Sequence, residues 1–280
     1  MPNLNSFVSD QVLEHLTMSE KKYLINIFQT YKGYPSLEQI WGLMDEVWLE
    51  LGCDPTKMDE KVAAFYRHPV WMLNGLFIEQ HPQSLANRHE FTNWVVRQAP
   101  MRIADFGGGF GGLARFIGQA LPAIQVEVVE PHPHPAGIEL VASTPNVRFV
   151  PELTRSYDLL IATDVFEHVL DPLALCAHTM NYLKLGGQYL IANCFQPVIK
   201  CHLPQLFYFE YGWESALTAM GLKSVERVSY GRAYRYAQDI NLSAARQAEK
   251  FARKLYPLLK LLPRGRARTG RLLMKLRRFR

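Results

Sequence analysis

The sequence feature that most restricts the fold is a glycine-rich turn at residues 105–112, which reads Asp-Phe-Gly-Gly-Gly-Phe-Gly-Gly. It follows a short apolar run at 101–106 and precedes a helical pattern at 113–120. A strand, a glycine turn and a helix in this order are typical of nucleotide-binding α/β proteins, whose ligand lies over the carboxyl ends of parallel strands. Glycines in the turn remove the Cβ atoms that would keep a ligand away from the backbone.

The residues after this turn continue the same alternation. Further short apolar runs stand at 126–130, 147–150, 158–162 and 188–192, and helical patterns stand at 173–183 and 213–220. The last two runs, 222–230 and 233–240, are separated by Gly231 and Arg232 and predict a terminal hairpin. Strands that alternate with helices predict a mostly parallel, doubly wound sheet, which we place at residues 99–241.

Residues 1–98 show apolar residues at helical spacing and no strand alternation. Ser36 is a candidate N-cap for a helix over 37–51, and shorter helices are expected at 62–66, 70–79 and 84–98. We therefore predict an N-terminal helical cap over residues 1–98. A lid over the binding site is the role that this position suggests.

The charge is unevenly distributed along the chain. Residues 246–280 contain 13 Lys and Arg and one acid, whereas the other 245 residues contain 18 basic and 25 acidic groups. Leucines at 255, 258, 259 and 262 have helical spacing, so residues 242–280 are predicted to be a basic amphipathic helix or tail. An anionic membrane surface, nucleic acid phosphates, or solvent alone could face this segment.

Composition excludes several classes of protein. Hydrophobic residues make up 48% and charged residues 20% of the chain, which is the balance of a globular protein rather than a disordered or fibrous one. No apolar run approaches the roughly 18–20 residues of a membrane-spanning helix, and the start lacks a signal-peptide pattern. The four cysteines are widely spaced, which excludes a disulfide framework and a zinc site made of thiolates alone. We expect a cytoplasmic protein, or one held at the inner face of a membrane by its tail.

Two acids narrow the ligand of the glycine turn. Asp105 stands two residues before Gly107, where a carboxylate would repel a pyrophosphate but attract an ammonium group. Glu130 ends the second predicted strand, where a carboxylate can accept hydrogen bonds from both ribose hydroxyls. This pair favours a nucleoside that carries an amino-acid cation, and a nicotinamide dinucleotide is the alternative.

With these residues the sequence resembles the class I S-adenosylmethionine (SAM)-dependent methyltransferases. Asp105, Gly107, Gly109 and Gly111 match their first motif, and Glu130 matches their ribose-binding acid. Residues 157–164 resemble their fourth strand, and 183–187 resemble the turn before the fifth. The resemblance implies a Rossmann-like sheet of seven strands, the last antiparallel, with SAM held by the five residues named here.

Arg88, 17 residues before Asp105, adds a further candidate contact with SAM. Some ubiquinone-pathway O-methyltransferases have an arginine at a similar place, and the resemblance implies that Arg88 pairs with the cofactor's carboxylate. A solvated arginine on a helix face is the alternative.

A second cluster follows the fourth strand, where Asp164, Glu167 and His168 have the spacing of one helical turn and would converge. Two carboxylates and an imidazole can hold Mg²⁺ or another divalent ion, or can orient a substrate hydroxyl. The pattern resembles ubiquinone-pathway O-methyltransferases and small-RNA 2′-O-methyltransferases. That resemblance implies a metal site of Asp164, Glu167 and His168, completed by His202 after the fifth strand.

Two other interpretations of this cluster stay open. Glu167, His168 and His202 are the candidate catalytic residues if the cluster contacts the substrate or removes its proton, and local packing is the third possibility. Asp164 also stands where it could contact SAM. The aromatic residues Tyr208, Phe209, Tyr211 and Trp213 are expected either to border the acceptor or to pack in the core.

The resemblance implies transfer of a methyl group from SAM to a hydroxyl, or alternatively an amine, of a small-molecule or glycan-like acceptor. An RNA ribose 2′-O-methyltransferase with a metal-assisted site is a second hypothesis. A non-catalytic SAM-binding protein, docked through its basic tail, is the third.

Overall fold

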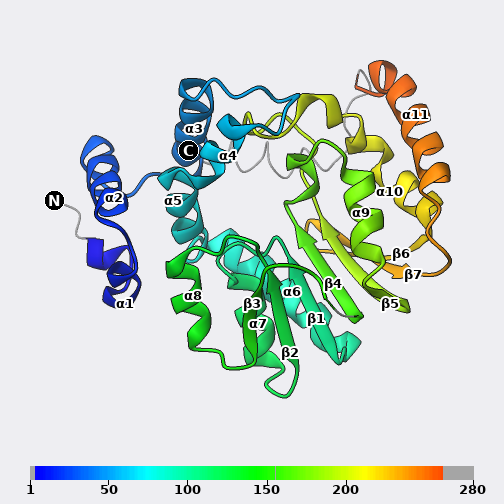
Figure 1. Ribbon diagram of the computed structural model, residues 1–280, viewed down its shortest axis with the longest axis horizontal. Coiled ribbons are helices and arrows are strands. Elements are labelled where there is room, and N and C mark those ends of the chain that lie inside the picture. Colours follow the sequence, from blue (N-terminus) through cyan, green and yellow to red (C-terminus); the bar gives the residue numbers. More distant parts are fainter. Residues whose placement is uncertain (1–3, 155, 261–280) are drawn as a thin grey trace, which may run out of the picture.

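The centre of the protein is a seven-stranded sheet (Figure 1). The computed structural model describes residues 4–154 and 156–260. The strand order is β3-β2-β1-β4-β5-β7-β6, and β7 alone runs antiparallel to its neighbours within this sheet. The predicted sheet of the class I methyltransferases, with its last strand antiparallel, is thereby confirmed. The strands are β1 (Arg102–Phe106), β2 (Gln125–Val129), β3 (Val147–Val150), β4 (Tyr157–Thr163), β5 (Leu183–Ala192), β6 (Leu222–Val228) and β7 (Gly231–Tyr236).

Helices cover both faces of the sheet. On one face, α6 (Pro82–Gln98), α7 (Gly112–Ala120) and α8 (Pro135–Ala142) share a core with the strands that includes Trp94, Ile103 and Ile117. On the other, α9 (Pro172–Met180), α10 (Phe209–Met220) and α11 (Leu242–Leu259) share a core that includes Leu160 and Leu217. The near-continuous apolar strands follow from this arrangement, because a parallel sheet covered on both faces has no polar side.

The N-terminal helices have a core of their own. They are α1 (Asp10–Glu14), α2 (Met18–Thr30), α3 (Leu37–Glu50), α4 (Glu60–Arg67) and α5 (Pro69–Ile78), after a short 3₁₀ turn at Leu4–Ser6. Capping boxes start α2 at Thr17 and α3 at Ser36, as the Ser36 signal predicts. Their core cluster includes Leu24, Ile40 and Trp48. Helix α6, which the sequence places in the cap, packs in the core of the sheet. The cap boundary at residue 98 stays a prediction.

Several expected element boundaries were wrong. Strand β5 begins at Leu183, not at 188, because positive φ at Gly186 (+83°) makes an irregularity that pairs Tyr157 with Leu183 and Leu159 with Gln188. The hairpin turn falls at residues 229–230, before β7, rather than at 231–232. The proline-rich segment after Glu130 contains α8, which begins with proline at its first helical position.

The C-terminal helix α11 (Leu242–Leu259) begins after an Asn241 cap, at the first residue of the predicted basic segment. The predicted tail over 242–280 lies inside the described residues only as far as 260. No helix within residues 4–154 and 156–260 combines the length and the apolar character needed to cross a membrane.

Candidate active site

The glycine loop lies at the carboxyl end of β1 and has a backbone that only glycine adopts easily. Gly107, Gly109 and Gly111 have φ of +69°, +54° and +71°. A Cβ at Gly107 would lie 2.7 Å from the Val165 side chain, and one at Gly111 would lie 2.6 Å from the Val141 side chain. A Cβ at Gly109 would meet no described atom within 4 Å. The loop therefore packs tightly at its two ends and presents open backbone at Gly109.

Asp105 places a carboxylate beneath this loop. Its side chain is 1% exposed, and neither oxygen has a hydrogen-bond partner among the described residues. Burial raises the pKa of Asp105 to about 7, although the charge of Arg88 opposes the shift. A buried acceptor without a donor fits a ligand that brings a cation or an N–H group to it. SAM, with its ammonium group, meets that requirement.

Glu130 follows β2, next to β1 in the sheet. Its side chain is half-buried, and Oε1 accepts a hydrogen bond from the His132 N–H at 3.4 Å. Burial raises the pKa of Glu130, and the His132 N–H opposes that shift. A second carboxylate on the neighbouring strand end is the placement expected for a ribose acceptor.

Arg88 lies behind the glycine loop. It forms an ion pair with Glu79 (3.2 Å between Nη2 and Oε1) and donates from Nη1 to the Ile78 carbonyl at 3.0 Å. A Cβ at Gly112 would lie 2.8 Å from its guanidinium. The guanidinium is thus buried between α5 and the start of α7 and not on a solvated helix face. Its pairing with the carboxylate of SAM stays a prediction.

Asp164 directly follows β4 and has an uncommon backbone conformation. Its φ is +54°, which is strained for a residue with a side chain. Its N–H donates to the Ala192 carbonyl at 2.7 Å, and its Oδ2 accepts from the Tyr230 hydroxyl at 2.8 Å. Tyr230, in the turn between β6 and β7, is a site neighbour that sequence reasoning missed, because nothing in its local pattern relates it to β4.

The predicted helical turn after Asp164 is a 3₁₀ turn at Phe166–His168. The turn brings Glu167 and His168 together with His202, and one ligand atom from each lies within 4.8 Å of the others. The carboxylate of Asp164 is not one of this group of three, although it lies in hydrogen-bond contact with Glu167. The structure therefore assembles three of the four predicted metal ligands, which we call the Glu–His–His cluster.

Both imidazoles of the Glu–His–His cluster are held in one orientation. Nδ1 of His168 lies 3.1 Å from the Cys201 carbonyl, and Nδ1 of His202 lies 2.9 Å from the Gln196 carbonyl. A carbonyl oxygen only accepts, so each Nδ1 carries the hydrogen and each Nε2 keeps a lone pair. The two rings lie 5.0 Å apart, nearly perpendicular. Such anchoring through Nδ1 is common for metal-binding histidines.

Burial controls the charges of this cluster. It lowers the pKa of His168 to about 3, with a further contribution from His202, and it also lowers the pKa of His202. Burial and the neighbouring Asp164 carboxylate raise the pKa of Glu167 well above its usual range. Glu167 Oε1 accepts from the Cys194 N–H at 2.7 Å, which fixes the carboxyl group in place. The site thus contains two neutral imidazoles beside two carboxyl groups that repel each other when both are ionised.

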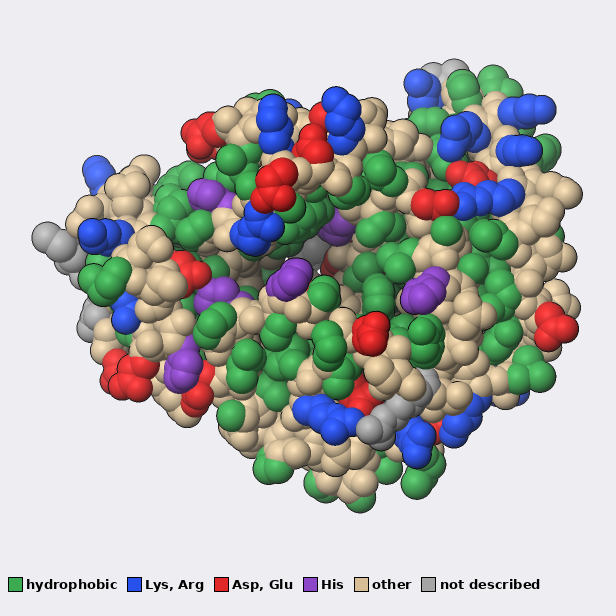
Figure 2. All heavy atoms as spheres, in the orientation of Figure 1, with side chains coloured by type: hydrophobic (Ala, Val, Ile, Leu, Met, Phe, Trp, Pro, Cys, Tyr) green, Lys and Arg blue, Asp and Glu red, His purple; other side chains and the backbone are tan. Residues whose placement is uncertain are grey.

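Two aromatic residues of the cap border the cluster. The rings of Tyr66 in α4 and Trp71 in α5 lie 6.3 Å and 6.1 Å from the His168 ring and 5.0 Å from each other. Sequence reasoning missed both, since apolar spacing in a helix indicates core and does not show which side chains face a site. Figure 2 shows a hollow near the middle of one face of the molecule, with histidine and hydrophobic side chains around it.

Three of the aromatic residues expected near the acceptor pack in the core. Tyr208, Phe209 and Trp213 are 4%, 1% and 9% exposed and belong to the core between the sheet and α10. Their helix covers the sheet, so its aromatic side turns inward. The core interpretation is therefore the correct one for these three residues.

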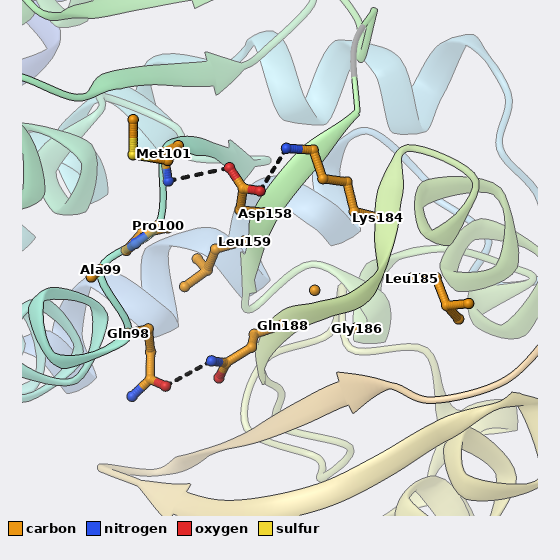
Figure 3. A pocket seen from close by; sticks show the side chains of 11 residues that line it. Gln98, Ala99, Pro100, Met101, Asp158, Leu159, Lys184, Leu185, Gly186 and Gln188 are labelled. Carbon is orange, nitrogen blue, oxygen red and sulfur yellow. Dashed lines mark hydrogen bonds and ion pairs between the residues drawn. The ribbon is translucent and has the colours of Figure 1, made fainter.

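A separate depression of about 380 Å³ lies at the opposite edge of the sheet (Figure 3). Asp158 forms its wall, with an ion pair to Lys184 (2.7 Å) and a hydrogen bond from the Arg102 N–H (2.8 Å), and Gln188 donates to Gln98 across it. These residues lie at the amino ends of β1 and β4, away from the edge where α/β sheets bind ligands. They tie the strand starts together.

Comparison with known proteins identifies the family. A family model described as a methyltransferase domain matches residues 76–230, more than half of the chain. The chain belongs to this family, within the class I SAM-dependent methyltransferases. The matched residues run from the end of α5 to the turn before β7, so they contain both the glycine loop and the Glu–His–His cluster.

Individual relatives are more distant. A ubiquinone biosynthesis O-methyltransferase of Ruegeria sp. is 28% identical over 130 residues, which are 42% of this chain and 52% of that protein. The chain thus spans about half the length of this curated relative. An O-methyltransferase family protein from Burkholderia thailandensis shares the fold, with a TM-score of 0.51, 11% identity, and coverage of 72% of this chain and 71% of that one. Human N-acetylserotonin methyltransferase, solved with SAM, gives 0.46 at 15% identity, covering 71% and 67%.

Proposed function

We propose that this protein transfers the methyl group of SAM to a hydroxyl group of a small-molecule acceptor. The observation that carries the proposal is the Glu–His–His cluster, which offers two Nε2 lone pairs and a carboxyl group at the ends of β4 and β5. These groups can accept the proton of a hydroxyl, or they can hold a cation that binds the hydroxyl oxygen as the proton leaves. The name of the Ruegeria relative, an O-methyltransferase, supports the same acceptor chemistry.

SAM supplies an electrophilic methyl group on a sulfonium. Asp105 and the open backbone at Gly109 would hold its amino-acid end, and Glu130 its ribose. Val165 packs against Gly107 and so connects this loop to the turn that carries Glu167 and His168. The residues that bind SAM and those that address the acceptor are therefore fixed relative to each other, as positioning catalysis requires.

An acceptor hydroxyl must lose its proton as it attacks, whereas a neutral amine can attack first. The lowered pKa of His168, about 3, makes this imidazole a weak base at neutral pH but leaves its lone pair available. Histidine nitrogens and a carboxylate are ligands for a divalent cation, which would lower the pKa of a bound hydroxyl. A cation would also relieve the repulsion between Asp164 and Glu167. We therefore include a divalent cation on Glu167, His168 and His202 in the proposal.

Tyr66 and Trp71 would form the cap side of the acceptor site. Their rings flank His168, and flat side chains at this place favour acceptors that have a planar or apolar part beside the reacting hydroxyl. Since these residues come from α4 and α5, the cap would determine which acceptor enters.

Methyl transfer from labelled SAM tests the proposal. The purified full chain is incubated with hydroxyl acceptors, amine acceptors and single-stranded RNA, each with Mg²⁺, Mn²⁺ or Zn²⁺ and with a chelator. We expect hydroxyl acceptors to be methylated, with loss of activity in the chelator. His168→Ala and His202→Ala should each lower kcat/KM by about 100-fold or more while calorimetry shows unchanged SAM binding.

His178→Ala in α9 is the matched control, because this ring packs against Tyr182 away from the cluster and its loss should leave activity unchanged. Methylation of amines alone would contradict the hydroxyl assignment, and methylation of RNA alone would contradict the small-molecule assignment. Full activity in the presence of the chelator would contradict the divalent cation in the proposal. SAM binding with no acceptor methylated, in wild type and variants alike, would support a binding protein instead.

A further inference from the structure

The side of α11 that faces away from the protein body combines cations with exposed apolar side chains. Phe251 and Leu258 are 63% and 66% exposed, although both are apolar. Lys250 and Lys254 are exposed beside them, and spacings of three, four and seven residues place all four on one side of the helix. We call these four residues the outer face of α11.

The opposite side of α11 is the side that packs against the protein body. Ala245 and Ala252 are buried against α10, and a Cβ at Gly212 would collide with Ala252. Small residues therefore let the two helices approach closely, so that side of α11 is fully used for packing. A helix that is packed on one side and apolar on the other has a second surface that water does not stabilise.

The charges of α11 are also divided between its two sides. Glu249 is the helix's one acid, and it accepts from the Tyr208 hydroxyl (2.5 Å) and pairs with Arg246 (3.0 Å) and Arg253 (3.3 Å). It is thus neutralised against the body. Lys250 and Lys254 have no ion-pair partner among the described residues, so the outer face is positively charged. Figure 2 shows this gathering of Lys and Arg side chains over α11, at the upper right.

We propose that the outer face of α11 docks this protein on a membrane surface rich in anionic lipids. The lysines match the lipid phosphates, while Phe251 and Leu258 enter the boundary between headgroups and acyl chains. Sequence-independent binding to nucleic acid uses cations for the phosphates and aromatic rings for the bases, so it gives no role to an exposed aliphatic side chain such as Leu258. The sequence after α11 continues the charge, with eight Lys and Arg and no acid in residues 261–280.

Flotation with lipid vesicles tests the proposal on the full chain. Vesicles of phosphatidylcholine with about one quarter phosphatidylglycerol should bind the protein, and pure phosphatidylcholine vesicles should not. Lys250→Glu with Lys254→Glu should lower the bound-to-free ratio by about tenfold or more. Phe251→Ser with Leu258→Ser should lower it by about fivefold or more without any change in charge. The lysine and the apolar substitutions should each lower the bound-to-free ratio by these factors, independently of the contribution of residues 261–280.

Lys21→Glu with Lys22→Glu in α2 is the matched control, since it changes the net charge equally on another surface and should leave the ratio within about twofold. Circular dichroism verifies that each variant is folded. Equal binding to neutral and anionic vesicles overturns the proposal. If the Phe251→Ser, Leu258→Ser variant binds anionic vesicles as strongly as the wild type does, the proposal is also overturned. Release of the protein from the vesicles by single-stranded RNA would then indicate a nucleic acid surface instead. Methyl transfer is not measured, so either result leaves the proposed function standing.

Discussion

Replacing Asp105 by asparagine should stabilise the ligand-free protein at pH 8 and weaken its binding of SAM. The carboxylate is buried beneath the glycine loop without a hydrogen-bond partner in the described part of the chain, and burial raises its pKa to about 7. Folding therefore opposes ionisation of this group at neutral pH. Asparagine has nearly the same shape and no charge, so it removes the unfavourable term without leaving a cavity.

The size of the effect follows from the pKa. The ordinary value for aspartate is 3.8, so the folded state raises it by about three pH units, which corresponds to roughly 4 kcal/mol. Between about pH 4 and pH 7 the folded protein holds the Asp105 proton and the unfolded chain has lost it. The free energy of unfolding therefore falls as the pH rises through this window, and the full penalty applies above about pH 7.

Urea unfolding at several pH values, followed by circular dichroism, measures this term. The Asp105→Asn variant should resemble the wild type at pH 4 and exceed its free energy of unfolding at pH 8, by up to roughly 4 kcal/mol. Calorimetry should show SAM binding weakened by about tenfold or more, because a charge-assisted contact with the ammonium group is lost.

Asp158→Asn is a control of opposite sign. Partial burial raises the pKa of Asp158, but hydrogen bonds from Lys184 and from backbone N–H groups outweigh burial and lower it. Removing this carboxylate should therefore destabilise the protein at pH 8. If Asp105→Asn is no more stable than the wild type at pH 8, or if its advantage does not grow between pH 4 and pH 8, the buried carboxylate is not strained. Unchanged SAM binding would refute its role at the ligand.

Three other substitutions test the fold and the site. Glu79→Gln should destabilise the protein by about 3 kcal/mol in urea unfolding, because the buried Arg88 and Arg115 both pair with this carboxylate; equal stability would show that the charges are solvated. Gly212→Val should lower the thermal midpoint through overpacking of about 1–3 kcal/mol against α11, and an unchanged midpoint would mean that α11 is not closely packed. Trp71→Ala should raise the KM for the acceptor by about tenfold with SAM affinity unchanged, and an unaltered KM would place the acceptor elsewhere.

The fold and the placement of the glycine loop at a strand end could be predicted from the sequence because their signals are local. A glycine turn between a strand and a helix has one common structural solution. Asp105 takes its position from β1, in which it is the last residue but one, and Glu130 from β2, which it follows directly. The N-terminal helices α2 and α3 could also be predicted, because their N-caps and apolar spacing lie within single helices. The boundaries that failed, at β5 and in the β6–β7 turn, depend on pairing with distant strands.

Only the tertiary structure decided which of the candidate side chains meet. The cluster forms because His202, 34 residues after His168, folds back beside it, and because carbonyl groups of Cys201 and Gln196 orient both rings. Asp164 lies beside Glu167 and also accepts a hydrogen bond from Tyr230, a partner that its spacing along the chain does not indicate. Tyr66 and Trp71 reach His168 only through packing of the cap. Spacing along the chain specifies local geometry, whereas burial, pKa and contacts between distant residues arise when the layers close.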